Sequence, residues 1–152
     1  MNNINEIEIL LIEDNQDDLD MTLRALRNSN FANRVEVARD GVEALEFIFC
    51  EGRHAGRKRE NKLKVILLDL KLPKMDGFEV LKRLKSNPET RAIPVVVLTS
   101  SREQRDVVET YQLGVNSYIV KPVNFEGFAA AVRDLGMYWL LLNQPPETAA
   151  QR

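Results

Sequence analysis

The chain has little cysteine, no long apolar run and almost no excess charge of one sign. Cys50 is the single cysteine among 152 residues, which excludes an internal disulfide and favours a reducing, cytoplasmic compartment. The apolar run near the end, MYWLLL, is far too short to span a bilayer, and the opening MNNINEIE lacks the features of a signal peptide. A formal net charge of −2 argues against a general nucleic-acid binder.

The composition that remains is that of one soluble globular domain. Hydrophobic residues make up 44% of the chain and charged residues 29%, and the length suffices for a substantial core. We expect the domain to cover residues 1–143 and the remainder, 144–152, to form a disordered tail that ends in PPETAAQR.

Strand-like apolar runs alternate with helical patterns along the whole chain. Runs rich in β-branched residues predict strands, and apolar residues three and four positions apart predict helices. The predicted strands cover 7–13, 34–38, 64–70, 93–99 and 115–120, and the predicted helices cover 17–29, 41–49, 77–86, 103–113 and 124–142. The first, third and fourth strands are almost wholly apolar, as parallel strands covered on both faces should be. The alternation predicts an α/β domain with a doubly wound parallel sheet.

Polar residues stand at the ends of the first, third, fourth and fifth predicted strands. The carboxyl ends of parallel strands meet at one edge of a sheet, and open α/β sheets bind their ligands outside that edge. The fold should therefore gather at one point the residues Glu13, Asp14, Asp69, Thr99, Lys121 and Pro122.

The three carboxylates of this set would repel one another, and a divalent cation relieves that repulsion. Hard carboxylate oxygens suit Mg²⁺, which keeps positions open for a phosphate oxygen. Asp69 is then a candidate nucleophile, because a carboxylate can accept a phosphoryl group to give an acyl phosphate. Lys121 would neutralise charge on the transferring oxygens, and the Thr99 hydroxyl would bond to one of them. Pro122 is a candidate for a cis peptide bond that would aim Lys121 inward.

Each of these residues also has a plain structural explanation. A single Asp at a strand end is commonly a helix N-cap, a single Thr is a good β-former, and a single Lys is a solvated charge. The run of Glu13, Asp14 and Asn15 could simply cap the first helix. The joint occurrence of all these residues at strand ends favours a shared site over separate roles.

From the first strand to the last helix, this combination resembles the receiver domain of two-component response regulators. The resemblance implies a flavodoxin-like, CheY-like (βα)5 fold with strand order 2-1-3-4-5. It implies a switch that accepts a phosphoryl group on Asp69 and promotes only its own phosphorylation and dephosphorylation, rather than an enzyme. The implied Mg²⁺ ligands are Glu13, Asp14, Asp69 and the main-chain carbonyl of Lys71, the implied switch residues are Thr99 and Tyr118, and the implied phosphate contact is Lys121.

A finer resemblance is to single-domain regulators paired with phytochrome-type histidine kinases. It rests on the basic loop before the third strand, the run DLKLPKMDG and the ending YWLLLNQPP. It implies a sensor histidine kinase that supplies a phosphohistidine, since the only histidine here, His54, lies in the basic loop and is a poor donor. Phosphorylation would draw Thr99 toward the phosphate and Tyr118 inward, and the reshaped surface would act through protein contacts.

Two segments offer surfaces for partners. The basic loop 51–64 is interpreted as a solvated surface in preference to a docking site for an acidic partner or a lipid, so neither nucleic acid nor membrane is expected. The last helix carries Tyr138, Leu140 and Leu141 outside its core-facing stripe, and surplus apolar surface usually marks an interface. We expect a homodimer through this helix, or through the face formed by the fourth helix, fifth strand and fifth helix.

Three other functions remain open at this point. A Mg²⁺-dependent phosphohydrolase with an aspartyl nucleophile usually has a second acid two residues after the nucleophile, where Lys71 follows Asp69. A flavin-binding flavodoxin needs a hydroxyl- and glycine-rich loop after the first strand, where Glu13, Asp14 and Asn15 would repel phosphate. An unphosphorylated receiver scaffold is disfavoured by the intact set of acids, Thr and Lys.

Overall fold

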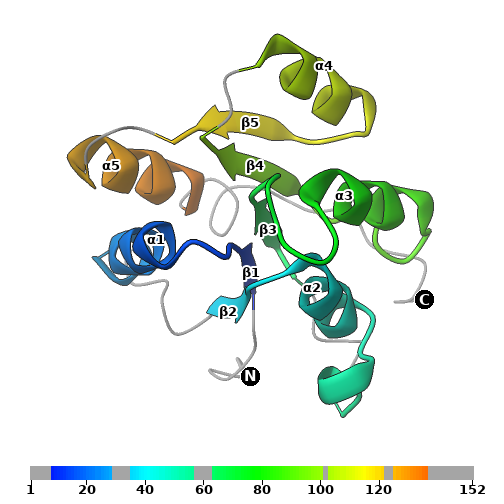
Figure 1. Ribbon diagram of the computed structural model, residues 1–152. Coiled ribbons are helices and arrows are strands. Elements are labelled where there is room, and N and C mark those ends of the chain that lie inside the picture. The colour runs from blue at the N-terminus through cyan, green and yellow to red at the C-terminus, as the bar shows by residue number, and fades with distance from the viewer. Residues whose placement is uncertain (1–7, 29–34, 57–62, 101–102, 122–124, 137–152) are drawn as a thin grey trace.

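The computed structural model describes residues 8–28, 35–56, 63–100, 103–121 and 125–136. These residues form a five-stranded parallel sheet with helices packed on both faces (Figure 1). The strand order is β2-β1-β3-β4-β5, and every neighbouring pair is parallel. This confirms the predicted doubly wound fold and its strand order. In the described part of the chain, no helix is both long and apolar enough to cross a membrane.

The elements alternate in the predicted sequence. The strands are β1 (Ile9–Ile12), β2 (Val35–Ala38), β3 (Val65–Leu68), β4 (Val95–Thr99) and β5 (Ser117–Val120). The helices are α1 (Gln16–Asn28), α2 (Gly41–Ile48), α3 (Gly77–Ser86), α4 (Gln104–Gln112) and α5 (Phe125–Gly136), with a 3₁₀ turn, η2 (Gly52–His54), that the sequence does not predict. The described strands are shorter than their apolar runs, because flanking residues such as Leu70 and Val115 are buried without belonging to the strands.

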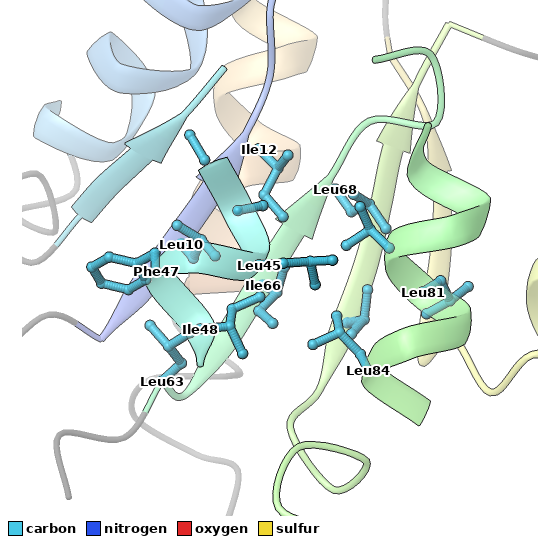
Figure 2. Close-up of a cluster of buried hydrophobic side chains, with 14 of the residues drawn as sticks. Leu10, Ile12, Leu45, Phe47, Ile48, Leu63, Ile66, Leu68, Leu81 and Leu84 are labelled. Carbon is cyan, nitrogen blue, oxygen red and sulfur yellow. The ribbon is translucent and has the colours of Figure 1, made fainter. Parts of the chain in front are cut away.

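Two apolar clusters fill the space between the sheet and its helices. Side chains of a strand alternate between faces, so Leu10 and Ile12 of β1 enter one cluster while Ile9 and Leu11 enter the other. The first cluster lies against α2 and α3 (Figure 2), and the second lies against α1 and α5, which run side by side. Strands β1, β3 and β4 are buried along their whole length, which explains their almost purely apolar sequences.

Side-chain caps determine where three of the helices begin. A capping oxygen accepts a hydrogen bond from a backbone N–H of the first turn, which would otherwise lack an intrahelical partner. The caps and their donors are Asn15 with Asp18, Asp40 with Glu43, and Asp76 with Glu79, at 2.9, 2.8 and 3.0 Å. Helices α1, α2 and α3 therefore start at defined points beside the carboxyl ends of the strands.

Gly77, the first residue of α3, allows that helix to begin directly against the loop that follows β3. A Cβ atom at this position would lie 2.5 Å from the carbonyl oxygen of Asp69 and 2.7 Å from the Cα of Leu70. Only glycine fits so close a backbone approach. The Gly77 N–H also donates to the Leu70 carbonyl at 2.9 Å, so the loop that carries Asp69 is tied to α3.

Candidate functional site

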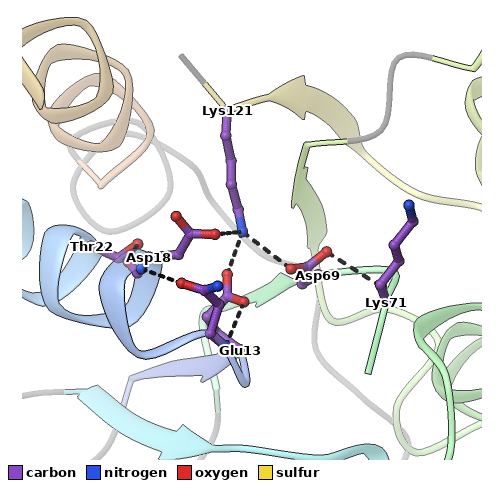
Figure 3. Close-up of polar contacts among 7 residues, drawn as sticks. Glu13, Asp18, Thr22, Asp69, Lys71 and Lys121 are labelled. Atoms are coloured by element: carbon purple, nitrogen blue, oxygen red, sulfur yellow. Dashed lines mark hydrogen bonds and ion pairs between the residues drawn. The ribbon is translucent and has the colours of Figure 1, made fainter. Parts of the chain in front are cut away.

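Glu13, Asp69 and Lys121 meet at the carboxyl edge of the sheet (Figure 3), where Asp14 lies close to Glu13 and Asp69. Backbone hydrogen bonds continue the sheet beyond the strands and hold three of these residues. Glu13 N–H donates to Ala38 at 3.0 Å, Asp69 N–H donates to Ile12 at 3.1 Å, and Lys121 N–H donates to Thr99 at 2.8 Å. The site is therefore built on the rigid end of the sheet rather than on free loops.

The ammonium group of Lys121 lies at the centre of the site. Its Nζ donates to Glu13 Oε1 at 2.5 Å, to Asp18 Oδ2 at 2.8 Å and to Asp69 Oδ2 at 3.1 Å. An ammonium has three N–H donors, so each of them has a carboxylate acceptor. The Lys121 side chain is only 6% exposed, which makes these charge-assisted bonds important for keeping the charge buried.

An acidic cluster adjoins this ammonium. Glu13, Asp14 and Asp69 each offer a carboxylate oxygen, and these oxygens all lie within 4.8 Å of one another. Glu13 and Asp69 are buried while Asp14 is exposed, so the cluster has an open side toward solvent. Three hard oxygen donors with an open side suit Mg²⁺ or Mn²⁺, which bind few protein ligands and retain waters. The donor set thus fits the metal that the sequence predicts.

Burial shifts the pKa values of the two most enclosed groups. Burial raises the pKa of Glu13 from 4.5 to about 7, with the hydrogen bond from Lys121 acting in the opposite sense and the negative charge of Asp69 acting in the same sense. Burial alone would lower the pKa of Lys121, but hydrogen bonds to Asp18 and Glu13 and the charge of Asp69 outweigh it and raise that pKa. Lys121 is therefore a fixed positive charge beside Asp69 at neutral pH.

The loop after β3 holds Asp69 from its other side. The Lys71 N–H lies 3.4 Å from Asp69 Oδ1, and the Lys71 side chain is exposed. Lys74 of the same loop takes a left-handed backbone conformation, with φ of 65°, and its ammonium lies 3.4 Å from Asp40, the N-cap of α2. The predicted role of the Lys71 carbonyl as a metal ligand stays a prediction.

The two predicted switch residues lie on neighbouring strands. Thr99 is the last residue of β4 and is fully buried, and it pairs with Val120 of β5. Tyr118 pairs with Val97 and is partly buried against the cluster under α2 and α3. Their movement on activation stays a prediction.

Several predicted residues lie outside the described part of the chain. They are the cis-proline candidate Pro122, the interface candidates Tyr138, Leu140 and Leu141, and the tail 144–152.

Asp18 is the residue of the site that the sequence interpretation missed. It stands in the first turn of α1, where acidic residues are common because they complement the helix dipole, so its presence alone carries no functional signal. One usable signal was geometric: side chains on a helix lean toward its N-terminus, which here lies beside the end of β1.

The sequence matches the model of the response regulator receiver domain over residues 9–133. The response regulator Rcp1 of Synechocystis sp. is 39% identical over 132 residues, which covers 87% of this chain and 88% of the relative. A probable methanogenesis regulatory protein of Methanothrix harundinacea, FilR2, is 42% identical over 141 residues, covering 93% and 88%.

Solved structures agree with these sequence matches. The phosphorylated cyanobacterial phytochrome response regulator RcpA has a TM-score of 0.85 at 39% identity, covering 93% of this chain and 99% of that one. The Mn²⁺-bound form of Rcp1 has a TM-score of 0.83 at 37% identity, with the same coverage. The bacteriophytochrome response regulator RtBRR has a TM-score of 0.74 at 51% identity, covering 95% and 87%.

Proposed function

The chain belongs to the response regulator receiver domain family, and we propose that it acts as a phosphorylation switch with Asp69 as the acceptor. The observation that carries this proposal is the ammonium of Lys121, which contacts Asp69 and Glu13 beside a cluster of three carboxylates. A buried cation and a metal-binding acid cluster around one carboxylate are what transfer of a phosphoryl group requires. The proposed domain covers residues 1–143, with 144–152 as a tail.

The proposed reaction begins on a phosphohistidine of a partner kinase. A carboxylate oxygen of Asp69 forms a bond to phosphorus, the phosphorus–nitrogen bond breaks, and its electron pair stays with the imidazole nitrogen. Lys121 balances the negative charge of the transferring oxygens, and the Thr99 hydroxyl donates a hydrogen bond to one of them. The protein ends the step as an acyl phosphate and so acts as a switch that is not itself a turnover enzyme.

Glu13, Asp14, Asp69 and the main-chain carbonyl of Lys71 are the proposed ligands of a Mg²⁺ ion. When bound, the ion supplies positive charge to the phosphoryl oxygens. The acidic cluster supports this assignment, as does the Mn²⁺-bound form of the relative Rcp1.

The proposed donor is a sensor histidine kinase of the phytochrome type. The similarity to RcpA, Rcp1 and RtBRR supports this class of partner, and we place the exchange in the cytoplasm, where the free thiol of Cys50 is stable. The test is transfer of labelled phosphate from such a kinase to the wild type and to Asp69→Asn. Label on the wild type alone is expected. Label on both proteins would disprove the acceptor, and label on neither would disprove the kinase class.

We also propose that the switch acts through protein contacts as a homodimer. Support comes from α4, where Val108 and Tyr111 are 44% and 51% exposed although both are large and apolar. The second proposed surface, around Tyr138, Leu140 and Leu141, rests on sequence. Light scattering with and without phosphorylation should detect a dimer in at least one state, and a monomer in both would refute the proposal.

A further inference from the structure

Asp18 is a carboxylate of the site for which the proposed reaction has no role. Its Oδ2 lies 2.8 Å from Lys121 Nζ, and its side chain is 28% exposed while that of Lys121 is 6% exposed. Figure 3 shows Asp18 approaching the ammonium from α1, on the side away from Asp69. The ion pair therefore joins the first turn of α1 to the end of β5 across the site.

The three acceptors of the Lys121 ammonium differ in one respect. Among the described residues, Glu13 and Asp69 also belong to the acidic cluster that suits a divalent cation, whereas Asp18 does not. Carboxylates that share their charge with a divalent cation attract the ammonium less, and the cation itself repels the ammonium. Asp18 lies outside this competition, so its attraction for Lys121 is retained.

The backbone of Asp18 is held in place on both sides. Its N–H donates to Asn15 Oδ1 at 2.9 Å, and its carbonyl accepts a hydrogen bond from Thr22 Oγ1 at 2.8 Å. Thr22 is fully buried, so this turn of α1 is part of the packed structure. An anchor of this kind can hold a long, flexible lysine side chain at one position.

We propose that Asp18 is a positioning residue that keeps the Lys121 ammonium beside Asp69 while Glu13 and Asp69 bind a divalent cation. Asp18 acts through Lys121 and does not itself touch the phosphoryl group or the metal. The proposal rests on the proposed function, in which Asp69 is the acceptor and Lys121 balances the phosphoryl charge. A merely structural ion pair between α1 and β5 is the competing explanation.

The first test follows the Lys121 ammonium directly by ¹H–¹⁵N NMR, with the signal assigned through a Lys121→Arg variant. The wild type should show a protected ammonium signal without metal and with Mg²⁺. Asp18→Asn should keep the signal without metal, because Glu13 and Asp69 still hold the ammonium, and should lose it with Mg²⁺. Asp17→Asn is the matched control, since Asp17 is an exposed neighbour in the same turn. An unchanged signal in Mg²⁺-loaded Asp18→Asn would overturn the proposal.

The second test measures phosphorylation of Asp69 by acetyl phosphate at saturating Mg²⁺. Asp18→Asn should react about tenfold more slowly than the wild type, which corresponds to about 1.4 kcal/mol in the barrier. Asp17→Asn should react at the rate of the wild type, and Asp18→Glu should recover part of the lost rate because it restores the carboxylate. Equal rates for Asp18→Asn and Asp17→Asn would contradict a positioning role.

The Mg²⁺ affinity separates positioning from metal ligation. Asp18→Asn should bind Mg²⁺ nearly as well as the wild type, whereas Asp14→Asn removes a proposed ligand and should bind it more weakly. A loss of Mg²⁺ affinity in Asp18→Asn as large as that in Asp14→Asn would make Asp18 a ligand and overturn the proposal. The NMR and Mg²⁺ measurements need no phosphate. If the wild type accepts no phosphoryl group, the proposed function is refuted. The NMR and Mg²⁺ measurements still show in that case whether Asp18 positions Lys121.

Discussion

At the scale of single residues, burial sets the properties of the acidic cluster. Glu13 is 2% exposed and hydrogen-bonded to Lys121, whereas Asp14, the next residue, is exposed to solvent. Two adjacent acids thus have different environments, although their carboxylate oxygens lie within 4.8 Å of each other. Asp14 is placed to meet an incoming cation, and Glu13 is placed to hold Lys121.

The buried Glu13 predicts a specific dependence of stability on pH. Between its unfolded pKa of 4.5 and its folded pKa of about 7, the folded protein keeps a proton that the unfolded chain has lost. Through this group, stability falls as pH rises across that window. Glu13→Gln should lack this fall. Its free energy of unfolding relative to that of the wild type should therefore rise by about 3 kcal/mol from the lower to the upper end of the pH window.

Urea unfolding in EDTA at several pH values from 4.5 to 8 measures this difference. Glu79→Gln serves as the control, because it removes an exposed carboxylate on α3. Plots of unfolding free energy against pH that run parallel for Glu13→Gln and the wild type would contradict a raised pKa of Glu13 in the folded protein.

At the scale of elements, the contact between α3 and the loop after β3 positions the acceptor. A Cβ at Gly77 would lie 2.5 Å from the Asp69 carbonyl oxygen, so Gly77→Ala must push the helix and the loop apart. We expect this variant to lose about 2 kcal/mol of stability in urea unfolding, as overpacked sites do. Gly56→Ala is the control, because a Cβ there meets no atom within 4 Å. Equal stability of the two variants would show that α3 does not constrain the loop.

Elements whose pattern is strong were predictable from sequence, and those that depend on contacts were not. Strands β1, β3 and β4 are apolar because both faces are buried, and α3 begins at Gly77, where the helical pattern predicts it. The turn η2 has no periodic pattern. It begins at Gly52, which like Cys50 has a left-handed backbone conformation, and the ring centroids of its His54 and of Phe47 in α2 lie 5.0 Å apart. These features arise only in the folded chain.

At the scale of the whole molecule, topology explains why most of the site could be predicted. Glu13, Asp69, Thr99 and Lys121 each follow or end a strand, so knowing the sheet is parallel places them together. Asp18 was missed because its contribution comes from a helix turn, where an acid has an ordinary structural role. Sequence pattern identifies strand ends directly, while the lean of a helical side chain toward the sheet edge is a weaker signal.

The central claim is that Asp69 accepts a phosphoryl group in a metal-dependent reaction. Intact-protein mass measured after incubation with acetyl phosphate and Mg²⁺ tests it most directly, on the wild type, on Asp69→Asn and on the wild type in EDTA. We predict one added phosphoryl group on the wild type with Mg²⁺ and none in the other two samples. An adduct of the same size on Asp69→Asn, or one formed equally well in EDTA, would contradict the account.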